Sequence, residues 1–541
     1  MTFVPAEAEK NTRNAVVRKI KTTNQEARTK KGQPGSWPLL GSFFSGVFLS
    51  LCYPMANFSW LAWIILTPFF MSVTRAHSRR QAIFLGWIFA LSFFVFSLQF
   101  LVHVAFAAWP ALALLESLYG LILGLLLFET RRFSSVVLRV LWIVSVWTAV
   151  EFLRTEIPVW GFGLNLLGHS QGFQPAMIQI ASVGGAYLLS FIMAGVNALI
   201  LEVICTAYNV NRTTRDRFVH CTLYALLALV VLSAVISYGV VRLNIADKQS
   251  APTLRLSVIQ PNIPQSVKWA LMAKQDVIEI HENLTQVAAL REPEMIIWPE
   301  ASFPGYFNAD YASASILEKF RAMAIPVLLG SPYWESETRI FNSVMLVDAQ
   351  AQITARYDKI RLVPFGEYVP WKLILGWLEP LAYTMGVGDF TAGKSQTLFR
   401  LAEHAFAVLI CFEDVFPDLA RTAVKKGAHF LTVVTNDAWF GKTGAPWQHF
   451  QTSIFRAVEN GVPVVRSGNT GVSGFISAEG RVLGVVKDKL GESRFVNGEL
   501  TMELPMAKHL TLYQKGGWIF PYSCVILLIA LFFFRKKEVK P

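Results

Sequence analysis

Long apolar blocks constrain the fold of this chain most strongly. They fill much of the sequence before residue 242 and return after residue 517. Most of them approach the roughly 20 residues that a helix needs to cross a bilayer. We therefore predict a polytopic membrane protein with about eight spans, of which the first two are short enough to lie tilted or half-inserted. The predicted spans are Leu39–Tyr53, Ser59–Val73, Gln81–Phe106, Trp109–Phe128, Val136–Leu153, Met177–Cys205, Phe218–Val241 and Trp518–Phe534.

Basic residues between these blocks indicate how the chain is oriented. The net charge is +12, but outside residues 243–517 the cations gather at alternate connections, which is the pattern that orients membrane helices. Nucleic-acid binding therefore receives little weight. By the positive-inside rule both termini are cytoplasmic and residues 243–517 lie outside. The basic residues are Arg75, Arg79, Arg80, Arg131, Arg132, Arg212, Arg215, Arg217, Arg535, Lys536 and Lys537.

These patterns divide the chain into five parts. Residues 1–38 are polar and basic without an apolar face, which predicts a disordered cytoplasmic tail. A seven-helix membrane domain covers residues 39–242, and a polar outer domain covers residues 243–517. A single span at 518–534 and a cytoplasmic tail at 535–541 follow. Because spans flank the outer domain on both sides, we expect its substrate at the membrane surface.

Four charged residues fall inside the predicted spans, where charge is costly. Glu116 and Glu151 are expected to face the bundle interior, and Arg139 and Arg154 to reach the interface from near helix ends. A transporter would use such groups as an ion path. Since these groups are few and no broken-helix repeat is visible, we favour a structural role.

The outer domain has a different pattern, in which strand-like runs alternate with helical ones. This alternation predicts an α/β domain with two sheets or one large sheet. The strand-like runs are Leu254–Gln260, Met295–Trp298, Pro326–Leu329, Ser343–Val347, Ala405–Ile410, Phe430–Val434, Val462–Arg466 and a hairpin over Phe475–Val486. The helical runs are Val267–Leu290, Tyr311–Met323, Asp418–Lys426 and Gln448–Asn460.

Cys411 ends one of these strands and is the only cysteine in the polar domain. The apolar run before it predicts a buried strand of a mostly parallel sheet, and Asp414 and Pro417 are expected to open the next helix. A thiol beside a helix N-terminus has a lowered pKa, and ligands of open α/β sheets bind at this edge. The alternative is that Cys411 is a small core residue.

Two other stretches carry the groups that a reactive thiol needs. Glu300 follows Trp298 and Pro299, and Lys359 lies in a Tyr-Asp-Lys run. Glu300 can accept the thiol proton and return it to a leaving group, while Lys359 can stabilise the thiolate and an oxyanion. No histidine is predicted to be as well placed: His404 begins the strand that Cys411 ends, and two further histidines lie in other segments. Those two are His429 and His449.

In this order, the three stretches resemble the Glu–Lys–Cys triad of the nitrilase (carbon–nitrogen hydrolase) superfamily. The multi-span part before the domain, the single span after it and the motif through Glu367 make the chain similar to the bacterial apolipoprotein N-acyltransferase family. Further matching stretches are Gln260–Gln265, Thr435–Gly441, Gln448–His449 and Arg466–Gly471.

The resemblance implies a fold, a place and a reaction. The fold would be an αββα sandwich on a bundle of eight helices, in a bacterial inner (cytoplasmic) membrane with the sandwich in the periplasm. Cys411 would take an acyl chain from a phospholipid such as phosphatidylethanolamine as a thioester. The α-amino group of the diacylglyceryl-cysteine of an apolipoprotein would then accept it. Glu300 would be the general base and Lys359 the oxyanion stabiliser. No metal or cofactor is implied.

The resemblance also implies supporting residues. Glu367 and Glu413 match family glutamates near the triad, which would orient Lys359 or shape the site, although structural ion pairs are nearly as good an interpretation. Trp269 and Trp439 match loop aromatics that would touch acyl chains, with ordinary packing as the alternative. Phe412 stands where the family often has tyrosine, so no hydroxyl is available there. Arg456 and Glu459 are also expected to form an i,i+3 pair.

Three other functions remain possible at this stage. A membrane-tethered amidase would use water as its acceptor, but a soluble amide would need no membrane bundle. A transporter with an outer binding domain would not need Cys411. A catalytically inactive scaffold would not need an intact triad.

Overall fold

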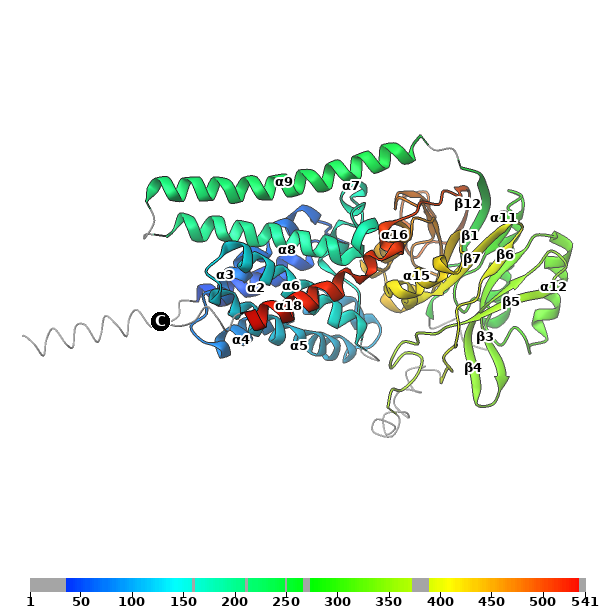
Figure 1. Cartoon of the computed structure of the whole chain (residues 1–541). Coiled ribbons are helices and arrows are strands. Elements are labelled where there is room, and N and C mark those ends of the chain that lie inside the picture. The colour runs from blue at the N-terminus through cyan, green and yellow to red at the C-terminus, as the bar shows by residue number, and fades with distance from the viewer. Residues whose placement is uncertain are drawn as a thin grey trace, which may run out of the picture.

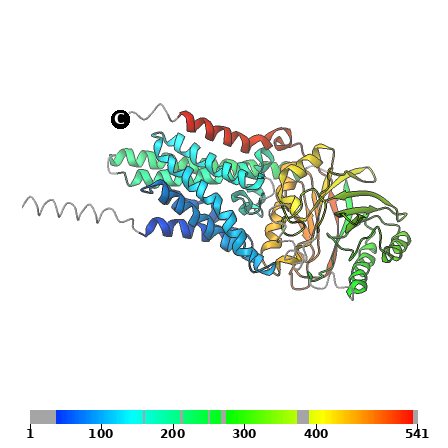
Figure 2. The ribbon, with the colours of Figure 1, turned by 90° about the horizontal axis from the view of Figure 1, so that it is seen from below.

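The computed structural model describes residues 36–157, 161–209, 213–248, 251–265, 273–371 and 389–534. A helical bundle forms one end of the molecule and an α/β domain forms the other (Figure 1), as the view from below also shows (Figure 2). Residues 1–35 of the predicted basic tail and Trp269 lie outside the described residues, whereas Trp37 and Pro38, which were predicted in that tail, begin a helix.

Within the described residues, five helices are long and apolar enough to cross a membrane. Three shorter apolar helical segments, Trp37–Ser50, Ser59–Thr74 and Gly517–Phe533, coincide with the remaining predicted blocks, so the count of eight spans stays a prediction. The helices of the bundle are α2 (Trp37–Ser50), α3 (Leu66–Thr74), α4 (Arg79–Ser97), α5 (Ala108–Phe128), α6 (Val136–Glu156), α7 (Pro175–Ile178), α8 (Ala181–Ala207), α9 (Thr214–Ala246) and α18 (Phe520–Phe534), with 3₁₀ helices η1 (Ser59–Trp63), η2 (Gln99–His103), η3 (Glu129–Arg132), η4 (Leu167–Gln171) and η9 (Gly517–Ile519).

The charges inside the bundle are paired. Arg154 lies 3.7 Å from Glu116, and Arg139 lies 2.6 Å from Glu202. Glu151 accepts a hydrogen bond of 2.7 Å from a main-chain N–H of the 161–171 loop. The expectation that Arg154 extends to the interface is wrong, because its side chain is only 5% exposed and its partner is buried. A buried charge is tolerated in hydrocarbon when it has such a partner.

The two ends of the bundle differ in composition and contacts. At one end, Arg79 pairs with Glu129 at 3.1 Å and Arg131 donates to the carbonyl of Ala76. The connections that carry these basic residues therefore lie together at this end of the bundle. At the other end, the connection after α2 touches the α/β domain, because Gln448 donates to the carbonyl of Pro54 at 2.8 Å.

The α/β domain contains two six-stranded sheets, ordered β12-β1-β2-β3-β4-β5 and β11-β10-β9-β8-β7-β6. Both are parallel only at their centres, through β1–β2–β3 and β7–β8–β9. The strands are β1 (Thr253–Gln260), β2 (Met295–Ile297), β3 (Val327–Ser336), β4 (Arg339–Val347), β5 (Ile353–Asp358), β6 (Phe399–Leu401), β7 (His404–Ile410), β8 (Phe430–Thr435), β9 (Val464–Gly468), β10 (Gly474–Ile476), β11 (Val482–Val485) and β12 (Gly498–Pro505). We did not predict β5, β6 or β12.

Four helices complete the layers of this domain. The two sheets pack face to face through apolar side chains such as those of Leu256 and Val408. Helices α11 (Lys274–Ala289) and α12 (Ala312–Met323) cover the first sheet, while α15 (Pro417–Lys425) and α16 (Ala445–Asn460) cover the second. The predicted αββα order is therefore present. The outer face of α16 packs on the bundle, so this helix lies between the second sheet and the membrane part.

Glycines allow α4 and α5 to pack closely against each other in the bundle. A Cβ atom on Gly120 of α5 would lie 2.4 Å from the carbonyl oxygen of Gly86 and 2.5 Å from the Cβ of Ala90, both on α4. Small residues let membrane helices approach closely and gain dispersion energy. The α4–α5 contact therefore depends on the missing side chain at Gly120.

We predict that Gly120→Ala lowers the thermal unfolding midpoint in detergent, because overpacking of this kind costs about 1–3 kcal/mol. The matched control is Gly195→Ala on α8, where the nearest atom to an added Cβ lies 3.4 Å away. The control should keep or raise the midpoint, since alanine favours a helix over glycine. Equal midpoints for the two variants would contradict the importance of this contact.

Candidate active site

The three residues of the predicted triad follow strands from both sheets. Glu300 lies just beyond β2, Lys359 directly follows β5, and Cys411 directly follows β7. Lys359 lies with its Nζ 3.3 Å from Oε1 of Glu300. The charges of Glu300 and Lys359 both act on the Cys411 thiol. The structure therefore brings the three residues together where the two sheets meet.

Lys359 is held between two carboxylates. Its Nζ also lies 2.9 Å from Oε1 of Glu367, and the side-chain amide of Asn342 donates to both glutamates at 2.8 and 2.7 Å. Lys359 is 1% exposed. Burial alone would lower the pKa of Lys359, but Glu367 and Glu300 outweigh it and hold the pKa above its usual value. The ammonium therefore keeps its charge at neutral pH.

Cys411 has an unusual main-chain conformation, with φ of +51°. This left-handed region is rare for a residue with a side chain and costs about 1–3 kcal/mol. A short 3₁₀ helix, η7 (Cys411–Val415), follows, and α15 begins only at Pro417. Pro417 therefore opens the helix, as predicted, and η7 separates that N-terminus from the thiol.

The expected lowering of the thiol pKa, in contrast, is wrong. Burial raises the pKa of Cys411, Glu300 raises it further, and Lys359 opposes both. The resting group is consequently a protonated thiol. Since the thiolate is the nucleophile, a base must take the proton during the reaction. Two carboxylates, Glu300 and Asp437, raise the pKa of the thiol by their charge, and Glu300 has the larger effect.

Glu413 is fully buried and connects the Cys411 and Lys359 segments. Its carboxylate accepts hydrogen bonds from the main-chain N–H groups of Ile410, Ile360 and Arg361, at 2.8, 2.7 and 3.1 Å, and from the hydroxyl of Tyr357. Burial raises the pKa of Glu413 to about 7, although the Ile410 N–H and the charge of Lys359 act against the rise. Glu413 thus holds the main chain beside both Cys411 and Lys359, which is a positioning contact rather than an ion pair.

Phe412 lines a cavity of about 420 Å³ next to the triad. Its ring lies 5.2 Å from the ring of Phe416 and 6.1 Å from that of Phe162 in the bundle loop. The cavity extends from Ile360 and Leu362 toward the end of α6. Its other lining residues are Ile157, Gly161, Arg361, Pro364, Tyr368, Phe390 and Ala392.

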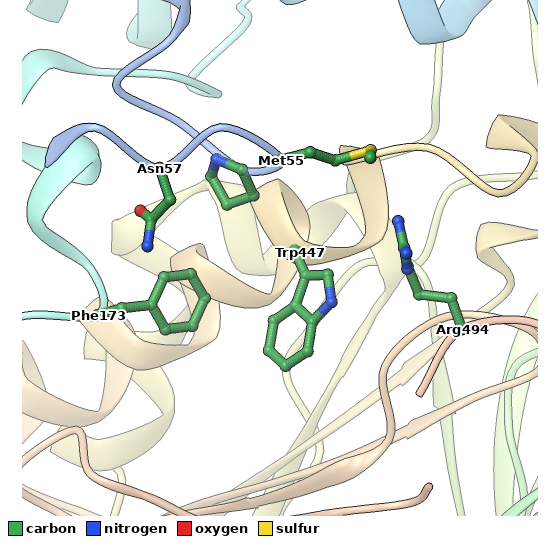
Figure 3. A pocket seen from close by; sticks show the side chains of 6 residues that line it. Met55, Asn57, Phe173, Trp447 and Arg494 are labelled. Carbon is green, nitrogen blue, oxygen red and sulfur yellow. The ribbon is translucent and has the colours of Figure 1, made fainter. Parts of the chain in front are cut away.

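A second cavity of about 360 Å³ lies further from the triad, where the bundle meets α16. Figure 3 shows Trp447 between Phe173 on one side and Arg494 on the other, below the loop that carries Met55 and Asn57. None of the predicted site residues lines it. Trp439, on the 3₁₀ helix η8 (Asp437–Phe440), is partly exposed and lines neither cavity.

Two residues near the triad were missed by sequence reasoning. Asn342 lies on β4 and bonds to both glutamates around Lys359; a polar residue inside an apolar strand was the available signal. His449 was placed in a separate segment, yet its Nε2 lies 3.2 Å from the main-chain carbonyl oxygen of Cys411. No local pattern pointed to that contact. The predicted Arg456–Glu459 pair is confirmed at 2.9 Å.

Comparison with known proteins identifies the family. The family model of the apolipoprotein N-acyltransferase N-terminal domain matches residues 45–199, and that of carbon-nitrogen hydrolase matches residues 255–493. An apolipoprotein N-acyltransferase of Geobacter metallireducens is 31% identical over 518 residues, covering 92% of this chain and 96% of that protein. The chain belongs to the apolipoprotein N-acyltransferase family. A second family member, from Allorhizobium ampelinum, is 32% identical and covers 81% of this chain and 83% of its own length.

Solved structures with some likeness come from the nitrilase superfamily. A mutant of the Nesterenkonia AN1 amidase is 19% identical, covers 49% of this chain and 94% of its own, and has a TM-score of 0.37. The membership of this chain in the acyltransferase family rests on the sequence matches and not on that likeness.

We predict that the charges around Cys411 can be read from its alkylation by iodoacetamide at pH 8. Glu300→Gln removes a charge that raises the thiol pKa, so alkylation should be faster, about tenfold for each unit by which the pKa falls. Lys359→Met removes the opposing charge, so alkylation should be slower.

Mass spectrometry of the Cys411 peptide separates this thiol from the other four cysteines, all of which are free. Equal alkylation rates in the wild type and both variants would show that neither charge acts on the thiol.

Proposed function

We propose that this chain transfers an acyl chain from a phospholipid, such as phosphatidylethanolamine, to the N-terminal diacylglyceryl-cysteine of apolipoproteins. The observation that carries the proposal is the meeting of Glu300, Lys359 and Cys411 beside the bundle. The membership of this chain in the acyltransferase family supports the same class of reaction. The reaction would complete lipoprotein maturation in two half-reactions that share one thioester.

In the first half-reaction, Glu300 takes the proton of the Cys411 thiol and the sulfur attacks the ester carbonyl of the phospholipid. Lys359 stabilises the oxyanion of the tetrahedral intermediate. The C–O bond then breaks, Glu300 returns the proton to the leaving oxygen, and a lysophospholipid departs. The raised pKa of the resting thiol makes the base necessary.

In the second half-reaction, the α-amino group of the lipoprotein cysteine attacks the thioester carbonyl. Glu300 accepts a proton from the amine, the C–S bond breaks, and the sulfur regains a proton. An amide and a free thiol result. A thioester is reactive enough for this step, and a site with little water favours the amine over hydrolysis.

The position of the site supports a lipid substrate. Val415, at the end of η7, and Phe416, just before α15, pack against Leu164 of the bundle loop. The cavity of about 420 Å³ runs from the triad region to Ile157, beside the end of α6. It is lined mostly by apolar side chains, and we propose that an acyl chain of the phospholipid occupies it.

We also propose that the α/β domain lies in the periplasm and that the bundle lies in the bacterial inner membrane. Arg79 and Arg131 lie at the end of the bundle remote from the contacts with the α/β domain. By the positive-inside rule that end is cytoplasmic.

The direct test of the proposed function is intact-protein mass spectrometry of the purified protein after incubation with phosphatidylethanolamine. The wild type should gain one hydroxylamine-labile acyl mass and pass it to the amine of an added diacylglyceryl-cysteine peptide. Cys411→Ala should gain none, and Glu300→Gln should gain it at least about 100-fold more slowly. An adduct that decays to free fatty acid without acylating the peptide would favour the amidase. A wild type that forms no adduct would refute the proposal.

The acyl cavity gives a separate prediction. Ala392 is exposed and lines the cavity, so Ala392→Phe would fill part of it without changing the core. Thioester formation from a long-chain phospholipid should slow several-fold more than formation from a short-chain one, because each CH₂ left out of the cavity loses about 0.8 kcal/mol of burial. The two lipids, compared in one variant, control for general damage. Equal slowing would exclude this cavity as the acyl site.

A further inference from the structure

Helix α16 joins the nucleophile to the membrane bundle. Every one of its residues except Trp447 is buried, although many of them are polar. A buried polar residue needs a hydrogen-bond partner to offset the loss of water. The partners of two successive residues, Gln448 and His449, lie in different parts of the molecule.

His449 faces the segment that carries Cys411. Its Nε2 lies 2.9 Å from Oδ1 of Asp414 and 3.2 Å from the carbonyl oxygen of Cys411, and its Nδ1 lies 2.9 Å from Oδ1 of Asp437. Both neighbours of Nε2 are acceptors, so Nε2 carries a proton in this arrangement. The Nε2–H group is therefore shared between a carboxylate and the carbonyl of the nucleophile.

Arg466 completes a fully buried charge cluster around the imidazole. Its guanidinium lies 3.0 Å from Asp414, 3.3 Å from Asp437 and 2.7 Å from Nδ1 of His449. Burial and Arg466 lower the pKa of His449, but the two carboxylates outweigh them and raise it to about 9. Arg466 can only donate to Nδ1, so the contact that the geometry supports at Nε2 is an N–H donor to the Cys411 carbonyl, whatever the net charge of the imidazole.

Gln448 faces the bundle. Its amide donates to the carbonyl oxygen of Pro54 at 2.8 Å and accepts a hydrogen bond of 3.2 Å from Asn165. Tyr53 in turn donates to the carbonyl oxygens of Asn165 and Leu166. The same turn of α16 is thus tied to two connections of the bundle and to the nucleophile.

We propose that His449 is a positioning residue for Cys411. Its Nε2–H holds the Cys411 carbonyl and so maintains the left-handed conformation in which the thiol faces Glu300 and Lys359. The unfavourable φ of Cys411 requires a contact that outweighs its cost, and the Nε2–H of His449 supplies a hydrogen bond to its carbonyl. Because Gln448 fixes the same turn, the bundle sets the position of the nucleophile.

The test uses two amide variants of His449 that differ in where they place the donor. A glutamine amide can reach the position of Nε2, whereas an asparagine amide reaches only that of Nδ1. The proposal rests on the proposed function for its first readout, the kinetics of thioester formation. His449→Asn should lower the rate at saturating phospholipid about 100-fold with little change in KM, because a small misplacement of a reacting atom has that effect. His449→Gln should recover most of the loss.

A second readout does not depend on acyl transfer. Glu300→Gln should speed alkylation of Cys411 in the wild-type and His449→Gln backgrounds, and should have no effect in the His449→Asn background, where the thiol no longer faces Glu300. If the wild type forms no thioester, the proposed function fails while this double-variant comparison still decides the role of His449.

Stability is controlled with Gln451→Leu, a change on the same helix at a buried residue whose side chain lies beside Gly172 of the bundle loop. It should alter the unfolding midpoint but leave the effect of Glu300→Gln intact. The positioning role is overturned if His449→Asn and His449→Gln behave alike, or if the effect of Glu300→Gln persists in His449→Asn.

Discussion

A buried ammonium needs anions, and the site is arranged around that need. Lys359 is almost inaccessible to water, so Glu300 and Glu367 must lie within contact distance to keep it charged. Asn342 bonds to both carboxylates and fixes their separation. The same charges act on Cys411, whose thiol stays protonated until a base removes the proton. The charges that keep Lys359 protonated therefore also act on the pKa of the Cys411 thiol.

The second determinant is the way in which the α/β domain meets the bundle. The two sheets pack against each other through an apolar interface. Here one helix layer, α15 and α16, contacts the bundle through its outer face. The segment after Cys411 packs against the bundle loop at Leu164. Cys411 therefore lies next to a segment that contacts the helical bundle.

Much of this arrangement could be predicted from the sequence, because local patterns carry it. Apolar blocks gave the bundle helices, and the apolar run before Cys411 gave β7 and the position of the thiol at a strand end. Strand β5 was missed although its apolar and polar side chains alternate, because it is short and only Tyr357 of its six residues is fully buried. His449 was missed because its contact with Cys411 joins residues 38 apart. The thiol pKa was wrong in direction because burial, which a sequence does not show directly, outweighs the cation.

The antiparallel pairing of β1 with β12 has a consequence for how the domain is attached. Thr253, where the chain comes from α9, stands opposite Pro505, after which the chain runs toward α18. A further hydrogen bond joins Met506 to the carbonyl of Pro252. The two ends of the domain therefore meet at one residue pair, Thr253 and Pro505, at the edge of the first sheet. Because α16 is also bonded to the bundle through Gln448, the domain has a second attachment, and the two together restrict its rotation about the β1–β12 edge.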